Sequence, residues 1–130
     1  MNRLFRASLP GSYRFPLRGN GTQSREFTFV EDVVEATIRA GFHLDDSQLE
    51  PLDIGGGVSA SLNEVINMVQ EITGSKTRID KHPLPPGDPK VTTASTASVK
   101  RLLGWEATTS LMEGLKKQHL SLAQELVPTL

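Results

Sequence analysis

The sequence contains no cysteine among its 130 residues, and only one tyrosine and one tryptophan. Without thiols it can form no disulfide framework, no thiolate metal site and no cysteine nucleophile. It also has no run of about 18 apolar residues, so we expect no membrane-spanning helix. The three histidines are far apart and lack metal-ligand spacing, and no serine lies in a G-x-S-x-G elbow. We expect His43 and His119 to be exposed, whereas His82, beside a proline-rich segment, could line a site.

Acidic residues are missing from residues 1–25, which carry five arginines: Arg3, Arg6, Arg14, Arg18 and Arg25. The remaining chain is acidic, so the net charge of −1 hides a cationic start and an anionic body. A duplex-DNA-binding domain is usually basic overall, and this pattern instead indicates one local anion site and no nucleic-acid partner. An arginine-rich, acid-free start is also typical of a mitochondrial transit peptide, which stays open as an alternative to a folded segment.

The length and the apolar fraction of 37% predict a single globular domain, residues 1–130. Helices interspersed with short strands indicate an α/β fold. Gly41, Gly74 and Gly104 are placed to end three of the helices, and capping boxes at Ser61 and Ser110 open two. The expected helices cover residues 3–9, 31–40, 61–73, 96–103 and 110–126. The expected strands cover 13–18, 25–30, 51–54 and 76–80. Loops are expected at 43–50, with a solvated Asp45–Asp46 pair, and at 81–90.

A glycine run follows the expected strand 51–54. Residues 55–60 fit G-x-G-x-x-A, and Asp80 lies 25 residues after Gly55. In a dinucleotide fingerprint such glycines let backbone amides approach a pyrophosphate at a helix N-terminus. The capping box places the helix start at Ser61, which is too late for that motif. A strand-to-helix turn that needs positive φ is the alternative interpretation.

Three stretches together resemble one family. Residues 19–36 resemble the G-[DN]-G-x-Q-x-R-[DE]-F-x-[YF]-V-x-D-V-x-x-A segment of extended short-chain dehydrogenases that act on nucleotide sugars. Residues 53–66 resemble its N-x-G-x-G…S-x-x-E segment, and residues 87–115 its closing G-D-P…L-G-[WY]-x-P…E-G-L segment. The chain is therefore similar to the C-terminal, substrate-binding portion of the NAD-dependent epimerases, dehydratases and decarboxylases of UDP-, dTDP- and GDP-sugars.

The resemblance implies a cytoplasmic enzyme of carbohydrate metabolism whose NAD-binding Rossmann half would precede residue 1. The family's catalytic Y-x-x-x-K pair has no match, because Leu17 stands four residues after the sole tyrosine, Tyr13. We therefore expect neither NAD binding nor turnover from this chain alone, and no metal. It would pair with the missing half or form a homodimer. The alternatives are a stand-alone nucleotide- or anion-binding module and a non-catalytic remnant that self-associates.

The resemblance also suggests substrate-binding residues. Arg25 matches an arginine that contacts the diphosphate, and a guanidinium can pair two phosphate oxygens. The alternative for Arg25 is an ion pair with Glu26 or Glu31. Asp88 matches the aspartate of the G-D pair, near the ribose and phosphates, or is a turn residue.

Residues 15–18 match the strand whose backbone meets the nucleotide base, which makes Leu17 and Arg18 candidates. Several positions depart from the family pattern. Arg18 replaces the usual aromatic residue before the turn, and Pro85 replaces an arginine that contacts phosphate in many members. The other departures are Asp53, Ser95 and Ala107.

Overall fold

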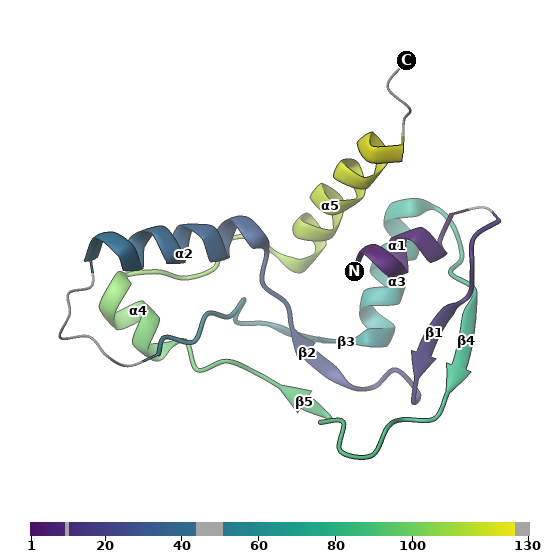
Figure 1. The fold of residues 1–130 in the computed structure, drawn as a ribbon, viewed down its shortest axis with the longest axis horizontal. Coiled ribbons are helices and arrows are strands. Elements are labelled where there is room, and N and C mark those ends of the chain that lie inside the picture. Colours follow the sequence, from purple (N-terminus) through teal and green to yellow (C-terminus); the bar gives the residue numbers. More distant parts are fainter. Residues whose placement is uncertain (10, 44–50, 127–130) are drawn as a thin grey trace.

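A computed structural model, shown in Figure 1, describes residues 1–9, 11–43 and 51–126. Helices alternate with short strands, which confirms the α/β class. The helices are α1 (Asn2–Ala7), α2 (Val30–His43), α3 (Leu62–Thr73), α4 (Ala97–Leu103) and α5 (Leu111–Leu126). The strands are β1 (Phe15–Arg18), β2 (Ser24–Glu26), β3 (Ser59–Ser61), β4 (Ile79–His82) and β5 (Val91–Thr92). None of the described helices is both long and apolar enough to cross a bilayer.

The strands form two small sheets. In one sheet β1 runs parallel to β4, with Phe15 opposite Ile79 and Arg18 opposite His82. In the other, β2 is the central strand, antiparallel to β3 and parallel to β5. The second sheet lies between the two ends of the molecule in Figure 1, with α2 and α4 at one end and α1, α3, β1 and β4 at the other.

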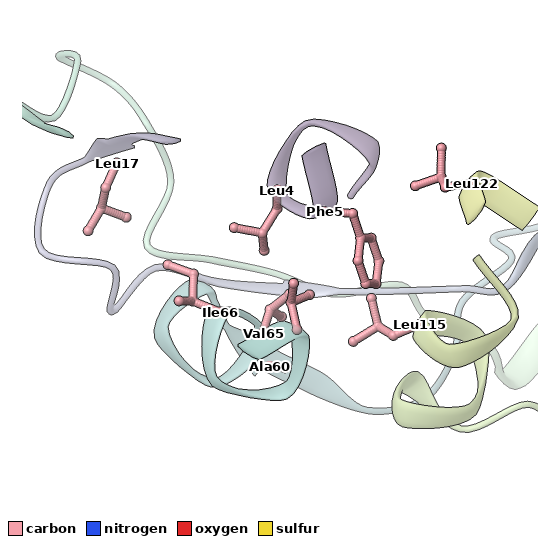
Figure 2. Packing of buried hydrophobic residues seen from close by; sticks show 9 residues of the cluster. Leu4, Phe5, Leu17, Ala60, Val65, Ile66, Leu115 and Leu122 are labelled. Atoms are coloured by element: carbon pink, nitrogen blue, oxygen red, sulfur yellow. The ribbon is translucent and has the colours of Figure 1, made fainter. Parts of the chain in front are cut away.

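A hydrophobic core joins α1, α3 and α5, and Figure 2 shows its side chains converging between these helices. Leu4 and Phe5 of α1 are buried in it, so the start of the chain packs into the domain as the folded-segment interpretation predicts. His119 of α5 stacks on Phe5, with ring centroids 5.5 Å apart. His119 is therefore half-buried and not exposed as predicted. His43 is exposed, and His82 is exposed beside Asp80, with 3.1 Å between Nε2 and Oδ2.

A second core cluster packs α2 against α4. Ala36 of α2, Val99 and Leu103 of α4, and Trp105 are buried in it. The inward side of α2 therefore consists of small and polar residues, with Ala36 and Asp32 as its buried members. This small-residue face allows close approach of α4.

Two expected elements around α2 need correction. The predicted strand 25–30 is shorter, because β2 ends at Glu26 and α2 already begins at Val30. Gly41 does not end the helix, which continues to His43. An exposed glycine inside a helix costs only about 1 kcal/mol, which the packing of α2 on α4 can offset. The predicted loop 43–50, with Asp45–Asp46, lies outside the described residues beyond His43.

The predicted strand 51–54 is also wrong, since these residues form no strand in the structure and β3 comes later, at Ser59–Ser61. Among the described residues, no backbone hydrogen bond joins Pro51–Ile54 to a neighbour. The segment has a strand-like sequence, but the described residues provide no strand that pairs with it. The predicted strand 76–80 is displaced toward the C-terminus, to β4.

At α3 the helix ends follow the predicted capping signals, and at α5 only half of the predicted capping box forms. Ser61 and Glu64 make the complete capping box of α3, and Gly74 ends the helix with φ of 64°. Hydrogen bonds from the Ser61 hydroxyl and amide lower the pKa of the Glu64 carboxyl. At α5 the Ser110 hydroxyl accepts from the Glu113 amide at 3.2 Å, whereas the Glu113 carboxylate lies 3.7 Å from the Lys117 ammonium.

Candidate functional site

Arg25 and Asp88, far apart in sequence, form an ion pair. Arg25 is the middle residue of β2, and Asp88 follows Gly87, whose φ of 82° turns the proline-rich loop. The Arg25 Nη2 atom lies 3.0 Å from Asp88 Oδ1, and each side chain is about one-third exposed, at 29% and 32%. Arg25 Nη1 also donates to the Ser24 carbonyl at 2.8 Å. The structure thus brings together the two residues assigned to the diphosphate and the ribose.

The predicted alternative partners of Arg25 bind elsewhere. The Glu31 carboxylate accepts from the Lys117 ammonium at 3.2 Å. Glu26 accepts from the Gly57 amide at 2.6 Å and from the Ala94 amide at 2.7 Å. The guanidinium of Arg25 is therefore held by one carboxylate that is itself partly exposed to solvent.

The glycine run is explained by Glu26. A side chain at Gly55 would collide with the Glu26 carboxylate, and one at Gly56 would collide with the Phe27 carbonyl oxygen. The Gly57 amide is already used by Glu26, and the run leads into β3 and not into a helix. This arrangement does not fit a dinucleotide pyrophosphate, and it favours the alternative interpretation, a turn in which Gly57 adopts a φ of 74°.

Strand β1 pairs with β4 on one side, and its other side is an open edge of the two-stranded sheet. The Phe15 amide donates to the Arg78 carbonyl, just before β4, and the Gly19 amide donates to the His82 carbonyl, so Leu17, between them, turns its backbone toward β4. The Leu17 side chain lies in the core, at 4% exposure. The assignment of Leu17 as a ligand-binding residue concerns its backbone and stays a prediction. Arg18 turns its amide to the open edge, while its carbonyl accepts from Gln23 Nε2 at 2.8 Å.

The turn between β1 and β2 is tied to the start of α3. Gly21 has a φ of 80°, and its carbonyl accepts from the Asn63 amide at 3.0 Å. The Asn63 side chain fills the space where a side chain at Gly21 would lie, and its amide nitrogen donates to the Asn20 carbonyl at 3.0 Å. The turn is a rigid connection that fixes where β2, and hence Arg25, begins.

Asp32 is a buried carboxylate that the sequence analysis did not single out, although it is the aspartate of the V-x-D-V motif. Its oxygens accept from the Thr108 amide at 3.3 Å, the Thr108 hydroxyl at 3.1 Å and the Thr109 amide at 3.1 Å. Burial alone would raise the pKa of Asp32, but these hydrogen bonds outweigh it and hold the pKa below the ordinary value. Asp32 therefore links α2 to the segment before α5 and plays a structural part.

Two cavities lie near β2, and neither is lined by Arg25 or Asp88 in the described part of the chain. One, of about 520 Å³, lies between the Phe27–Glu31 segment and α5. Lys117 stands over the Phe29 ring at 4.9 Å, and its hydrogen bond to Glu31 raises the pKa of its ammonium. The other, of about 270 Å³, is lined by residues that include Glu26 and Asp53.

Comparison with known proteins gives the class to which this arrangement belongs. The family profile described as GDP-mannose 4,6 dehydratase matches residues 8–118. UDP-glucuronate 4-epimerase of Thermodesulfobacterium geofontis is 35% identical over 100 residues, which are 76% of this chain and 30% of that protein.

Solved structures agree with this assignment. The Bacillus cereus UDP-glucuronic acid 4-epimerase in complex with UDP-glucuronic acid and NAD is 30% identical with a TM-score of 0.86. The match covers 95% of this chain and 39% of that one. The Thermotoga maritima UDP-glucose 4-epimerase with UDP-glucose is 29% identical with a TM-score of 0.85, over 95% and 39% of the two chains.

The fold and its motifs match part of the length of enzymes that modify nucleotide sugars. The chain belongs to the NAD-dependent nucleotide-sugar epimerase/dehydratase family, whose C-terminal portion it matches. It spans about a third of the length of the curated relatives it matches.

Proposed function

We propose that this chain binds the nucleotide diphosphate of a UDP-sugar, as the substrate-binding C-terminal portion of an NAD-dependent sugar epimerase or dehydratase. The observation that carries the proposal is the partly exposed Arg25–Asp88 pair on the scaffold of this family. UDP is favoured over dTDP and GDP because the complexes of the two solved relatives contain UDP-sugars. A cytoplasmic location agrees with such a substrate.

In this function Arg25 and Asp88 have complementary tasks. The guanidinium would bind phosphate oxygens through its planar donor fork, and the carboxylate would accept from ribose hydroxyls. The Asp88 carboxylate repels phosphate while it is paired with Arg25. If the carboxylate instead accepts from the ribose hydroxyls, the guanidinium becomes free to bind the diphosphate. Arg18, at the open edge of β1, would offer its amide to the base.

Chemistry on the sugar is not assigned to these residues. They would hold the nucleotide end of the substrate, and the binding energy from that remote group would position the sugar for groups outside this chain. NAD, when bound to the intact enzyme, supplies hydride transfer. The 130 residues alone are expected to bind UDP without turnover.

Calorimetry of the purified chain with UDP tests the proposal. A charge-assisted hydrogen bond contributes about 1.5–3 kcal/mol, so Arg25→Ala should weaken UDP binding roughly ten- to hundredfold. Arg101→Ala removes an equal charge from the exposed face of α4 and is the matched control. Equal affinity in the two variants, or no UDP binding at millimolar concentration by the wild-type chain, would refute the assignment.

Inorganic pyrophosphate separates the tasks of the two residues. Asp88→Asn should keep the pyrophosphate affinity unchanged or raise it, because the substitution removes a carboxylate that repels the anion. The same substitution should lower the UDP affinity, because it weakens the contact with the ribose. A parallel loss for both ligands would instead show that Asp88 only orients Arg25.

A further inference from the structure

The outer face of the β1–β4 sheet gathers basic residues from two distant parts of the sequence. Phe15 and Ile79, which pair across the two strands, pack against the core between α1, α3 and α5. Because side chains alternate along a strand, every second residue counted from their neighbours points away from that core. Figure 1 shows both strands together at one end of the molecule. The basic residues of these outward rows are all exposed, and we call them the basic face: Arg14, Arg18, Lys76, Arg78 and His82.

The two rows of the basic face lie next to each other. Arg18 is opposite His82 in the strand register. The Phe15 amide donates to the Arg78 carbonyl at 2.7 Å, which brings Arg14 beside Arg78. Neighbouring strands lie about 4.8 Å apart, and alternate residues of one strand about 7 Å apart. Like charges at these spacings repel each other, and an anion near the face relieves that repulsion.

Few acidic residues compensate the charge of the basic face. Asp80 is the single acidic residue between positions 72 and 87, and its Oδ2 atom lies 3.1 Å from His82 Nε2. Within the described residues, Arg14, Arg18 and Lys76 form no ion pair. Four basic residues on the helices are instead each paired with a glutamate: Arg6, Arg39, Lys100 and Lys117.

The basic face leads toward the candidate site. Arg18 ends β1, its carbonyl accepts from Gln23 Nε2 at 2.8 Å, and Arg25 follows two residues later in β2. From Arg18 the face extends about 13 Å along β1 to Arg14. Residues 26–130 carry more acidic than basic side chains, so most of the chain repels anions. A local positive region on such a molecule draws anions to itself and raises their rate of encounter.

We propose that Arg14, Lys76 and Arg78 of the basic face steer the diphosphate of the nucleotide ligand to Arg25, and so speed its association. The inference rests on the proposed function and adds a kinetic task for residues that do not touch the bound ligand. Two charges at about 18 Å from the diphosphate change the encounter rate about fourfold at 10 mM salt, where the Debye length is about 30 Å. At 150 mM salt, with a Debye length of about 8 Å, the change falls below about 1.5-fold.

Stopped-flow binding of a fluorescent UDP analogue to the purified chain tests the proposal. Arg14→Gln with Lys76→Gln removes two charges that form no ion pair among the described residues. At 10 mM salt the association rate constant should fall about fourfold, and the dissociation rate constant should stay unchanged. Arg14→Glu with Lys76→Glu doubles the change in charge and should lower the association rate constant about sixteenfold.

The matched control is Arg101→Gln with Lys116→Gln, which removes the same charge from exposed positions on α4 and α5. It should change the association rate constant less than about twofold. An equal loss in the control would show that net charge alone sets the rate, and would overturn the proposal. Association that is as fast in the double glutamine variant as in the wild type at 10 mM salt would also overturn it.

A loss confined to dissociation would overturn the proposal as well, because it would make the basic face a contact site for the bound ligand. Failure of the proposed function has a different signature. A wild-type chain that does not bind UDP refutes the nucleotide site, and the steering inference falls with it. A wild-type chain that binds UDP with association rates insensitive to these substitutions refutes the steering alone.

Discussion

The buried carboxylate of Asp32 should be one of the largest single contributors to the stability of this domain. Asp32→Ala would leave two backbone amides, of Thr108 and Thr109, without their acceptor. A fully buried donor left unsatisfied costs about 1–3 kcal/mol, and because both of these hydrogen bonds are only partly buried, each amide should cost toward the lower end of that range, with the lost Thr108 hydroxyl contact in addition. We therefore expect the free energy of unfolding to fall by about 3 kcal/mol, which corresponds to a melting temperature lower by roughly 12 °C.

Asp32→Asn should cost less, about 1–2 kcal/mol, because its carbonyl oxygen can still accept from Thr108. The side-chain amide nitrogen of the introduced asparagine would then face the Thr109 amide, donor against donor. Glu71→Gln, which alters an exposed carboxylate on α3, is the control and should leave stability unchanged. Urea unfolding at pH 7 measures all three variants.

The pH dependence gives a second test of the same residue. The folded pKa of Asp32 lies below its ordinary value, so the ionised form is the one that folding favours. Its contribution is fully present above the unfolded pKa of about 3.9 and is lost as the pH falls through the lower folded pKa. The stability gap between wild type and Asp32→Asn should therefore be constant from pH 5 to 7 and shrink in acid. A gap that stays constant down to pH 2.5, or no gap at pH 7, would refute this account.

Four further substitutions probe the scaffold of the site. Gly56→Ala forces a methyl group against the Phe27 carbonyl and should cost about 3 kcal/mol or more, whereas Gly57→Ala, with φ of 74° and open space, should cost about 1–2 kcal/mol. Equal losses in thermal melts would contradict the packing argument. Ser61→Ala removes the α3 cap and should cost about 1 kcal/mol by urea unfolding, with no effect on UDP affinity. Glu26→Gln should destabilise the domain by about 1–2 kcal/mol, because the single side-chain oxygen of the glutamine can replace only one of the two carboxylate oxygens that accept from Gly57 and Ala94.

Local signals in the sequence predicted the helices well. The capping box at Ser61 and the left-handed residues Gly74 and Gly104 fix helix ends through contacts within a few residues, and the structure confirms all three. The same reasoning failed at Gly41, because a glycine ends a helix only when no packing favours continuation. Helix α2 has such packing on α4.

Contacts between distant residues could not be predicted from spacing. Glu26 lies 31 residues before Gly57 and 68 before Ala94, and the G-x-G-x-x-A pattern gave no sign that a carboxylate would occupy its amide. Family motifs supplied Arg25 and Asp88, whose proximity the structure shows directly. The strand predicted at 51–54 failed for a related reason. Strand pairing depends on a partner, and the described residues provide none there.

Adjacent residues of β2 connect the candidate site to this scaffold. Arg25 and Glu26 point to opposite faces of the strand, as consecutive strand residues must. Arg25 reaches the loop before β5, at Asp88, while Glu26 reaches the loop after β5, at Ala94. Both ends of β5 are thus tied to the strand that carries the arginine. The site is therefore held in place before a ligand arrives, and less binding energy is needed to order the proline-rich loop.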